Sequence, residues 1–445
     1  MNMAKGLKHI AAQDLVEFLS DERLRKLRTV ADQGLLLHES LDDFELPEGY
    51  TKDEVWLILT AIRKQAAIFL PDDPFRDADF WFVTTSALSF DSKMLELRCA
   101  THFPLDLSLQ TLQGSPYITR FLEQTLARGL EADRISVTEE RIHEIFIGAP
   151  LENDIDRVIS NYFVLSNEAE HLAEREITHG LIETLYYQLI EGVDANQLPR
   201  RGEVCKLDER LLPPSSKDCL DAICQRASDD FGDESRFGPV LRIINVSWFF
   251  WNFDVFACLN TLVGILLRNI MAIKWGFPVL SWLPVGYYPF GHLDTPRMEA
   301  VFNNWSKDYG FGFDFTSYFA VNVQLYLEEL DRLELAIGEL ERLNQRIDEI
   351  LSSDINNRKK AILASLVREP DALLRIAPHQ RMFRVAYATA RADFLELERD
   401  GYLVREQEGK AFVFRACDDL RERIVRLGEA ALSLQASENT SNEMS

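Results

Sequence analysis

The stretch from Trp251 to Leu266, WNFDVFACLNTLVGIL, decides how this fold is interpreted, because it lies in the most apolar part of the sequence. Residues 243–267 form a run of 25 residues in which Asp254 is the only charged side chain. That length meets the criterion for a membrane span. However, a carboxylate near the centre of a span costs roughly 2.5–3.5 kcal/mol, and several Asn, Ser and Thr residues add to this cost. We therefore expect two buried helices joined by a loop near residues 254–260, and no membrane association.

The composition is that of a soluble globular chain with a marked acidic excess. Of 445 residues, 47% are hydrophobic and 27% are charged, and the formal net charge is −24. Such a charge disfavours coating of nucleic acid or anionic lipid by the whole surface, although a local basic face remains compatible with it. The N-terminal residues contain no run of seven apolar side chains, so we expect no secretory signal. The six cysteines show no CxxC pair, which indicates reduced, buried thiols and a cytoplasmic location.

The pattern of apolar residues predicts mainly helices in the remainder of the chain. Residues 53–69 have apolar side chains three and four apart and predict an amphipathic helix. Residues 80–97 contain two β-type runs, FWFVTT and KMLELRC, that suggest a hairpin. Residues 118–191 are again helical, with a break near 148–150, and residues 197–216 look irregular before helical periodicity resumes at 217.

Residues 318–351 predict one long helix with an apolar stripe at 3/4 spacing. One interpretation is a helix lying on the globular core. The alternative is a coiled-coil dimer, although the pattern covers only three heptads. The stripe consists of Leu330, Leu333, Ile337, Leu340, Ile347 and Leu351.

Residues 356–416 differ in charge and in pattern from the rest. They hold twelve Lys and Arg against eight Asp and Glu, a net +4, which leaves −28 for the remainder of the chain. Three helical segments (RKKAILASLVRE, IAPHQRMF and AYATARADFLELERDG) precede two β-type runs, YLVREQ and KAFVFRA. This order of three helices and a hairpin is typical of a winged helix-turn-helix.

With these segments in view, the chain resembles bacterial Fic (Fido) proteins that carry a C-terminal winged helix. The strings VAYATARADFLELERDGYLVREQEGKAFVF, GPVLRIINVSWFFWNFDVFACLN and DFTSYFAVNVQLYLEELDRLE resemble the winged helix, the signature helix and loop, and the last core helix of that family. The resemblance covers residues 118–416. It implies a mainly α fold in which a Fic-type helical core is followed by a winged-helix domain.

The resemblance also implies a chemistry that this chain has lost. The family signature reads HPFxDGNGRxxR: its His is the general base, its acid holds Mg²⁺, and its glycines and arginines hold nucleotide phosphates. In an ungapped comparison only Phe256 and Asn260 are retained. The His falls on Asp254, the Pro on Val255, the acid on Cys258, the glycines on Leu259 and Thr261, and the arginines on Leu262 and Ile265.

These replacements predict an inactive site without a cofactor or a metal. Asp254 is a poor base at neutral pH, and a positioned base is worth about 10²–10⁴ in rate. Cys258 is a soft ligand that is mismatched to Mg²⁺. Leu262 lacks the guanidinium with which an arginine would bind two phosphate oxygens. Family members often carry an inhibitory helix whose Glu blocks the γ-phosphate site. In the corresponding string TLARGLEADRIS, Glu131 (or Asp133) is the candidate.

If the winged helix binds DNA, the start of its third helix would enter the major groove. The candidate contacts come from the second helix, the turn, the third helix and the wing. They are His379, Arg381, Arg384, Tyr387, Thr389, Arg391, Arg405 and Lys410. The alternative is a protein–protein module, because the third helix is rich in alanine and the rest of the chain would repel DNA.

We therefore expect a pseudoenzyme that acts by binding, as a homodimer, to double-stranded DNA or to a protein partner. One alternative is a nucleotidyl or phosphoryl transferase with an altered motif, in which Asp254 is base or metal ligand and Asn260 binds phosphate. The other alternative is a protein–protein scaffold. The expected segments are an α+β leader at 1–105, the Fic-like core at 106–352, the winged helix at 353–420, and a helix end with a disordered tail at 421–445.

Overall fold

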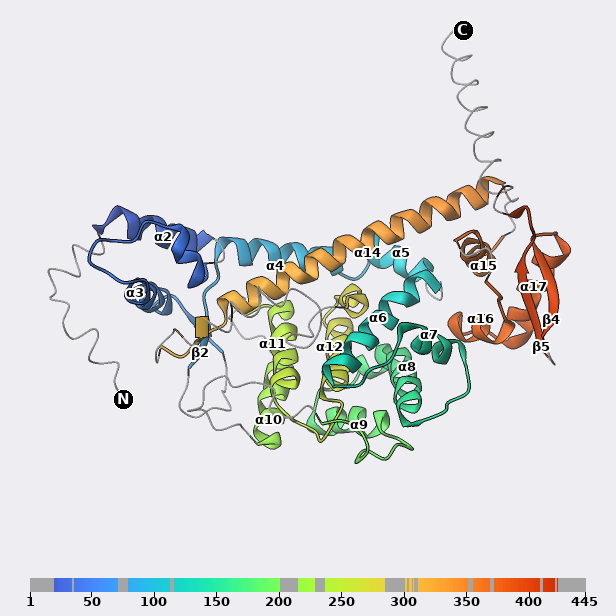
Figure 1. Ribbon diagram of the computed structural model, residues 1–445, viewed down its shortest axis with the longest axis horizontal. Coiled ribbons are helices and arrows are strands. Elements are labelled where there is room, and N and C mark those ends of the chain that lie inside the picture. Colours follow the sequence, from blue (N-terminus) through green and yellow to red (C-terminus); the bar gives the residue numbers. More distant parts are fainter. Residues whose placement is uncertain are drawn as a thin grey trace, which may run out of the picture. The chain divides into compact units, whose positions relative to one another are not determined.

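The computed structural model is mainly helical in the part of the chain that it describes (Figure 1). That part comprises residues 20–33, 36–70, 79–112, 116–200, 215–228, 237–284, 301, 304–305, 307, 311–350, 355–368, 372–408, 411–420 and 422. The only strands within it are five short ones. The expected mainly α class is confirmed. In the same ranges, no helix has the length and apolarity needed to cross a membrane.

The chain divides into two compact units that interleave along the sequence. The first comprises Met1–Thr101, Thr125–Val137 and Asn161–Glu329, and the second comprises His102–Gln124, Thr138–Ser160 and Leu330–Ser445. Three helices contribute residues to both units. They are α6 (Pro116–Ala132), α8 (Asp154–Ala173) and α14 (Thr316–Ile350).

The first unit begins with a small helical cluster. It contains α2 (Glu22–Gln33), the short 3₁₀ helix η3 (Glu39–Asp43) and α3 (Lys52–Lys64), which share buried side chains such as Leu27, Leu41 and Trp56. The side chain of Thr51 accepts from the Glu54 amide, and the Glu54 side chain accepts from the Thr51 amide, which makes a capping box. The helix predicted from residue 53 is therefore confirmed, but it ends at Lys64.

The hairpin expected at residues 80–97 is wrong. Strand β2 (Phe80–Phe82) pairs with β1 (Ile68–Phe69) and β3 (Phe313–Asp314), while residues 93–99 belong to helix α4 (Ser86–Cys99). The hydroxyl of Thr85 caps this helix by accepting from the Leu88 amide. Its buried positions, Leu88, Ser92, Leu95 and Cys99, are three or four residues apart, a helical spacing that outweighs the β-type composition.

The remaining described elements of the first unit are helical, and they include residues 251–266. Helices α11 and α12 lie side by side in Figure 1. The elements here are α9 (His179–Leu189), α10 (Ser216–Arg226), α11 (Pro239–Asn252), α12 (Asn260–Lys274) and the 3₁₀ helix η4 (Pro278–Trp282).

The second unit holds the C-terminal half of α14 and seven further described elements. The elements here are α5 (Pro104–Leu112), α7 (Glu139–Ile147), α15 (Asn357–Arg368), α16 (Ile376–Met382), α17 (Tyr387–Arg399), β4 (Leu403–Glu408) and β5 (Ala411–Ala416). Strands β4 and β5 form an antiparallel hairpin in which Leu403 faces Ala416 and Glu408 faces Ala411.

The apolar stripe of α14 packs on the protein's own core. Five of its six side chains, from Leu330 to Ile347, are buried within the chain, and the sixth, Leu351, lies outside the described residues. Arg332 donates to the Gln124 side chain at 2.9 Å, and Ser108 donates to Glu341 at 2.5 Å, so α14 runs along α5 and α6. The coiled-coil alternative is therefore wrong for these residues, because their apolar surface is already covered.

The described cysteines are all free thiols, as expected. Cys99, Cys219 and Cys258 are buried, and Cys224 and Cys417 are half-buried. Several expectations fall outside the described residues. They concern Cys205, most of the segment at 197–216 that was expected to be irregular, and the expected C-terminal tail.

Candidate functional site

Helices α11 and α12 form the interior of the first unit. Every residue from Val240 to Asn252 and from Asn260 to Ala272 is buried. A Cβ on Gly264 would lie 2.8 Å from Cβ of Phe250, so this glycine permits the close approach of the two helices. The prediction of two buried helices joined by a loop at 254–260 is confirmed.

The loop between the two helices is closed by its own Asn260. The Asn260 side chain accepts from the Phe256 amide and donates to the Phe256 carbonyl, both at 2.8 Å. Leu259, just before α12, has φ 56° and ψ 27°, a left-handed conformation that glycine adopts more readily than leucine. The Asn260 amide is therefore engaged within the loop and does not project toward a ligand.

The N-terminus of α12 is occupied by a carboxylate of the same chain. Asp133, which follows α6 and is 1% exposed, accepts from the Thr261 amide at 3.1 Å and from the Leu262 amide at 3.2 Å. The first amides of a helix have no partner within the helix and attract anions. Glu131, the first inhibitory-helix candidate, is exposed on α6, so Asp133 is the acidic residue that closes this end of the loop.

The two positions at which the resemblance places arginines hold apolar side chains. Leu262 and Ile265 are buried, and a Cβ on Gly129 of α6 would lie 2.7 Å from the first and 2.6 Å from the second. These side chains therefore pack directly against the backbone of α6. They leave no space between α6 and α12 at this point.

Cys258, where the resemblance places a metal-binding acid, is buried against Tyr186. Its Sγ lies 3.7 Å from the Tyr186 hydroxyl, and the Tyr186 ring stacks on Phe256 with centroids 4.4 Å apart. Burial raises the pKa of the Cys258 thiol, and the hydrogen bond from Tyr186 offsets part of that rise. A protonated, enclosed thiol is a poor ligand for Mg²⁺.

Asp254, where the resemblance places a general base, is exposed at the loop surface. The Ser216 hydroxyl reaches its backbone carbonyl at 3.5 Å. No group of three or more His, Cys, Asp or Glu side chains in the described chain could hold a metal ion. The histidines with acidic neighbours each approach one carboxylate: His143 approaches Glu123, His171 approaches Glu174, and His179 approaches Asp221.

In the second unit, a buried carboxylate joins the three C-terminal helices. Asp393 of α17 is 2% exposed and accepts from Nε and Nη2 of Arg358 at 2.7 and 3.0 Å. Nε2 of His379 lies 3.3 Å away and Nδ2 of Asn356 lies 3.4 Å away. Burial alone would raise the pKa of Asp393, but these hydrogen bonds outweigh it and lower the pKa to about 2.

Two of the expected DNA contacts meet other parts of the second unit: His379 is buried, and Arg381 is exposed but contacts α7. His379 is buried against Asp393, so its assignment to a DNA-facing surface is wrong. Arg381 lies against the end of α7, because a Cβ on Gly148 would be 1.9 Å from its Nη1. A guanidinium beside the C-terminal carbonyls of a helix is electrostatically favourable there.

The remaining described candidates lie at the surface. Arg384, with φ 52°, is in the turn before α17, and Tyr387, Thr389 and Arg391 are exposed on the first turns of α17. No side chain caps the α17 N-terminus at Ala386.

The cations of the β4–β5 hairpin are partly neutralised by nearby acids. Nε of Arg405 lies 3.1 Å from Glu398, and its guanidinium covers the Phe412 ring. Arg415 pairs with Glu406 and Asp418. Lys410 lies outside the described residues.

The role of Asp393 was not predicted from its sequence, and Asp133 was predicted only as the alternative to Glu131. A local signal existed for Asp393, because it stands among the buried positions Ala390, Phe394 and Leu397 of one helical face. No comparable local signal separates Asp133 from Glu131.

In comparisons with known proteins, no family model matches this sequence, and no curated protein is significantly similar to it.

Proposed function

We propose that this chain is a Fic-like protein that has lost nucleotide transfer and acts by binding, with its C-terminal segment as a DNA-binding winged helix. The loss of nucleotide transfer is supported by the Asp133 carboxylate, which accepts hydrogen bonds from the first amides of α12. In a Fic-type site, the end of the signature loop and the start of the following helix hold nucleotide phosphates. A fixed carboxylate at this place repels a phosphate and removes its donors.

The backbone of the loop supports a Fic-like origin. Leu259 stands where the resemblance places a glycine of the signature, and it retains a left-handed backbone at a cost of order 1 kcal/mol. A leucine held in this conformation fits a loop geometry inherited from a glycine-containing ancestor. The other replacements, Cys258, Leu262 and Ile265, pack as core side chains.

Calorimetry with ATP and Mg²⁺ tests the loss of nucleotide chemistry. We expect no heat of binding, because Asp133 holds the α12 amides and because Leu262 and Ile265, where the resemblance places the signature arginines, carry no charge. Incubation with labelled ATP is expected to leave both the native chain and the Asp254→Ala variant unlabelled. Micromolar binding, or labelling that Asp254→Ala abolishes, would favour an altered transferase instead.

The winged-helix proposal rests on the order and exposure of the C-terminal elements. Helices α15, α16 and α17 share the Asp393 network, and the β4–β5 hairpin follows them. The start of α17 presents Tyr387, 52% exposed, with Thr389 and Arg391. A hydroxyl and a guanidinium at an uncapped helix N-terminus suit phosphate and base-edge contacts in a major groove.

Fluorescence anisotropy with a labelled duplex of random sequence tests this surface. We expect binding with Kd of about 10⁻⁴–10⁻⁶ M that weakens steeply with added salt, as for non-specific DNA contacts. Arg391→Ala is expected to weaken binding and to reduce the salt slope by about 1. Arg399→Ala, a matched change on the last turn of the same helix where Arg399 pairs with Asp400, is expected to have no such effect.

Equal losses in the Arg391→Ala and Arg399→Ala variants would indicate general electrostatics rather than a specific face. No DNA binding at low salt would refute the DNA-binding role and favour a protein-binding module.

A further inference from the structure

Within the second unit, α7 packs directly against α16, the second helix of the proposed winged helix (Figure 1). Part of the contact is made where α7 ends. Gly148, the C-cap of α7, has φ 102° and ψ 30°. A Cβ on Gly148 would lie 2.5 Å from Cζ of Arg381, which stands in the last turn of α16, and closer still to its Nη1. One face of the Arg381 guanidinium therefore lies on the backbone of this glycine.

The contact lies beside the surface to which the proposed function assigns DNA. When the last helix of a helix-turn-helix enters the major groove, the helix before it crosses the DNA backbone. Arg381 at the end of α16, Arg384 in the turn and Tyr387 at the start of α17 follow one another along the chain at this place. A DNA phosphate beside α16 would therefore compete with the end of α7 for the Arg381 guanidinium.

The charge of α7 and of the residues that follow it opposes DNA binding. Residues 139–156 hold six Asp and Glu and a single Arg, a net −5 with neutral His. The exposed carboxylates of Glu144 and Glu152 lie 2.9 Å and 3.7 Å from the Arg141 guanidinium, which also pairs with the buried Asp156. One guanidinium does not neutralise three carboxylates, so the segment that contacts α16 repels DNA phosphates.

We propose that residues 139–156 autoinhibit the winged helix, by engaging Arg381 and by placing negative charge against α16. This inference rests on the proposed DNA-binding function. The structure shows the closed arrangement, and DNA binds tightly only after α7 separates from α16 and Arg381 pairs with a phosphate. Because the open form is a minor part of the population, the native chain binds duplex DNA more weakly than a chain in which the contact is broken.

Gly148→Ala tests the contact, with fluorescence anisotropy of a labelled random duplex as the measurement. The added methyl group displaces the Arg381 guanidinium, so we expect the variant to bind about ten-fold more tightly than the native chain, a usual size for coupling between two sites. Gly49→Ala is the control for strain at positive φ, because Gly49 has φ 79° and a Cβ there would meet nothing within 4 Å. We expect this control to bind DNA as the native chain does.

Arg381→Ala, made both in the native chain and in the Gly148→Ala variant, measures what the released guanidinium does. In the Gly148→Ala variant, we expect it to weaken binding and to reduce the salt slope by about 1, as for a lost phosphate contact. In the native chain we expect a much smaller loss, because removing Arg381 also weakens the closed arrangement. Equal losses in the two chains would overturn the proposal, since the two residues would then act independently.

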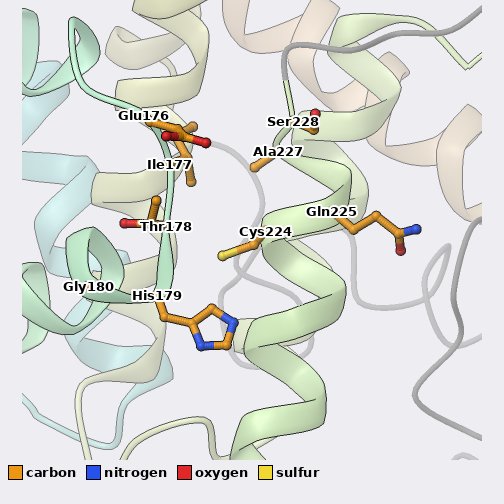
Figure 2. Close-up of a pocket in the computed structure, with 9 residues that line it drawn as sticks. All are labelled: Glu176, Ile177, Thr178, His179, Gly180, Cys224, Gln225, Ala227 and Ser228. Atoms are coloured by element: carbon orange, nitrogen blue, oxygen red, sulfur yellow. The ribbon is translucent and has the colours of Figure 1, made fainter.

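Glu144→Gln combined with Glu152→Gln tests the charge and leaves the backbone unchanged, so it applies even if Gly148→Ala fails to fold. We expect this double variant to bind DNA about five-fold more tightly than the native chain. Glu174→Gln combined with Glu176→Gln removes the same charge from exposed positions of the first unit, where Figure 2 shows Glu176 beside a cavity between α9 and α10. This control is expected to change the affinity by less than about two-fold.

The results also distinguish autoinhibition from the DNA-binding function itself. If neither the native chain nor any variant binds the duplex at low salt, both proposals are refuted. If the native chain binds, but Gly148→Ala and the Glu144→Gln, Glu152→Gln double variant bind no more tightly than their controls, autoinhibition alone is refuted and the DNA-binding winged helix stands.

Discussion

Replacing Asp393 by alanine is expected to destabilise the C-terminal helices and hairpin by about 3–5 kcal/mol. The buried carboxylate accepts two hydrogen bonds from the half-buried Arg358 and one from the buried His379. Its removal leaves the Arg358 guanidinium without its buried counter-charge. The measurement is hydrogen exchange of the amides in α15, α16 and α17, since the chain has two units and a single unfolding free energy would mix them.

Asp400→Ala is the matched control for this prediction. Asp400 follows α17, is exposed and pairs only locally with Arg399 in the described contacts, so its loss is expected to cost less than about 1 kcal/mol. Equal protection of the three helices in the native chain and in the Asp393→Ala variant would contradict a structural role for this carboxylate.

The same network predicts a dependence of stability on pH. The folded-state pKa of Asp393 is about 2, below its ordinary value of 3.8, so the group stabilises the fold above pH 3.8. This stabilisation is lost as the pH falls from about 4 toward 2, because the folded state must then give up a charge that it holds more tightly than the unfolded state. Exchange protection of α17 is expected to fall in this window in the native chain and to change less in the Asp393→Ala variant.

Replacing Asp133 by alanine is expected to destabilise the first unit by about 2–4 kcal/mol. The change leaves the buried amides of Thr261 and Leu262 without an acceptor, and it removes a negative charge from the N-terminus of α12. Thermal and denaturant unfolding, with exchange of the α12 amides as the local readout, measure the effect. Asp133→Asn keeps one acceptor oxygen and is expected to lose less.

Glu131→Ala provides the control for this second prediction, since Glu131 is exposed on the same helix. We expect a change within about 0.5 kcal/mol, the range of ordinary surface substitutions. A larger loss for Glu131→Ala than for Asp133→Ala would mean that the wrong acid has been assigned to the loop. It would also remove the observation on which the proposed loss of nucleotide binding rests.

Much of the helical framework could be predicted from the sequence, because helical periodicity is a local property. The apolar run around Asp254, interrupted by polar residues, predicted two buried helices and their connecting loop. The 3/4 spacing in residues 318–351 predicted α14, and the alternation of helical and β-type runs after residue 356 predicted three helices and a hairpin. The exception was α4, where β-type composition concealed a helix that Thr85 caps.

The pairing of these elements depended on the tertiary structure. Local spacing identifies the apolar face of a helix but not what covers it. The apolar stripe of α14 was therefore compatible both with packing on the protein's own core and with a coiled-coil dimer. Glu131 and Asp133 differ little in sequence terms, yet only Asp133 meets the α12 amides, from 128 residues away along the chain. His379 was expected at the surface, but the fold buries it beside Asp393, and the contact of the exposed Arg381 with the end of α7 was not predicted. A hydrogen bond between distant residues forms only where packing brings donor and acceptor together, and no local pattern of residues encodes that distance.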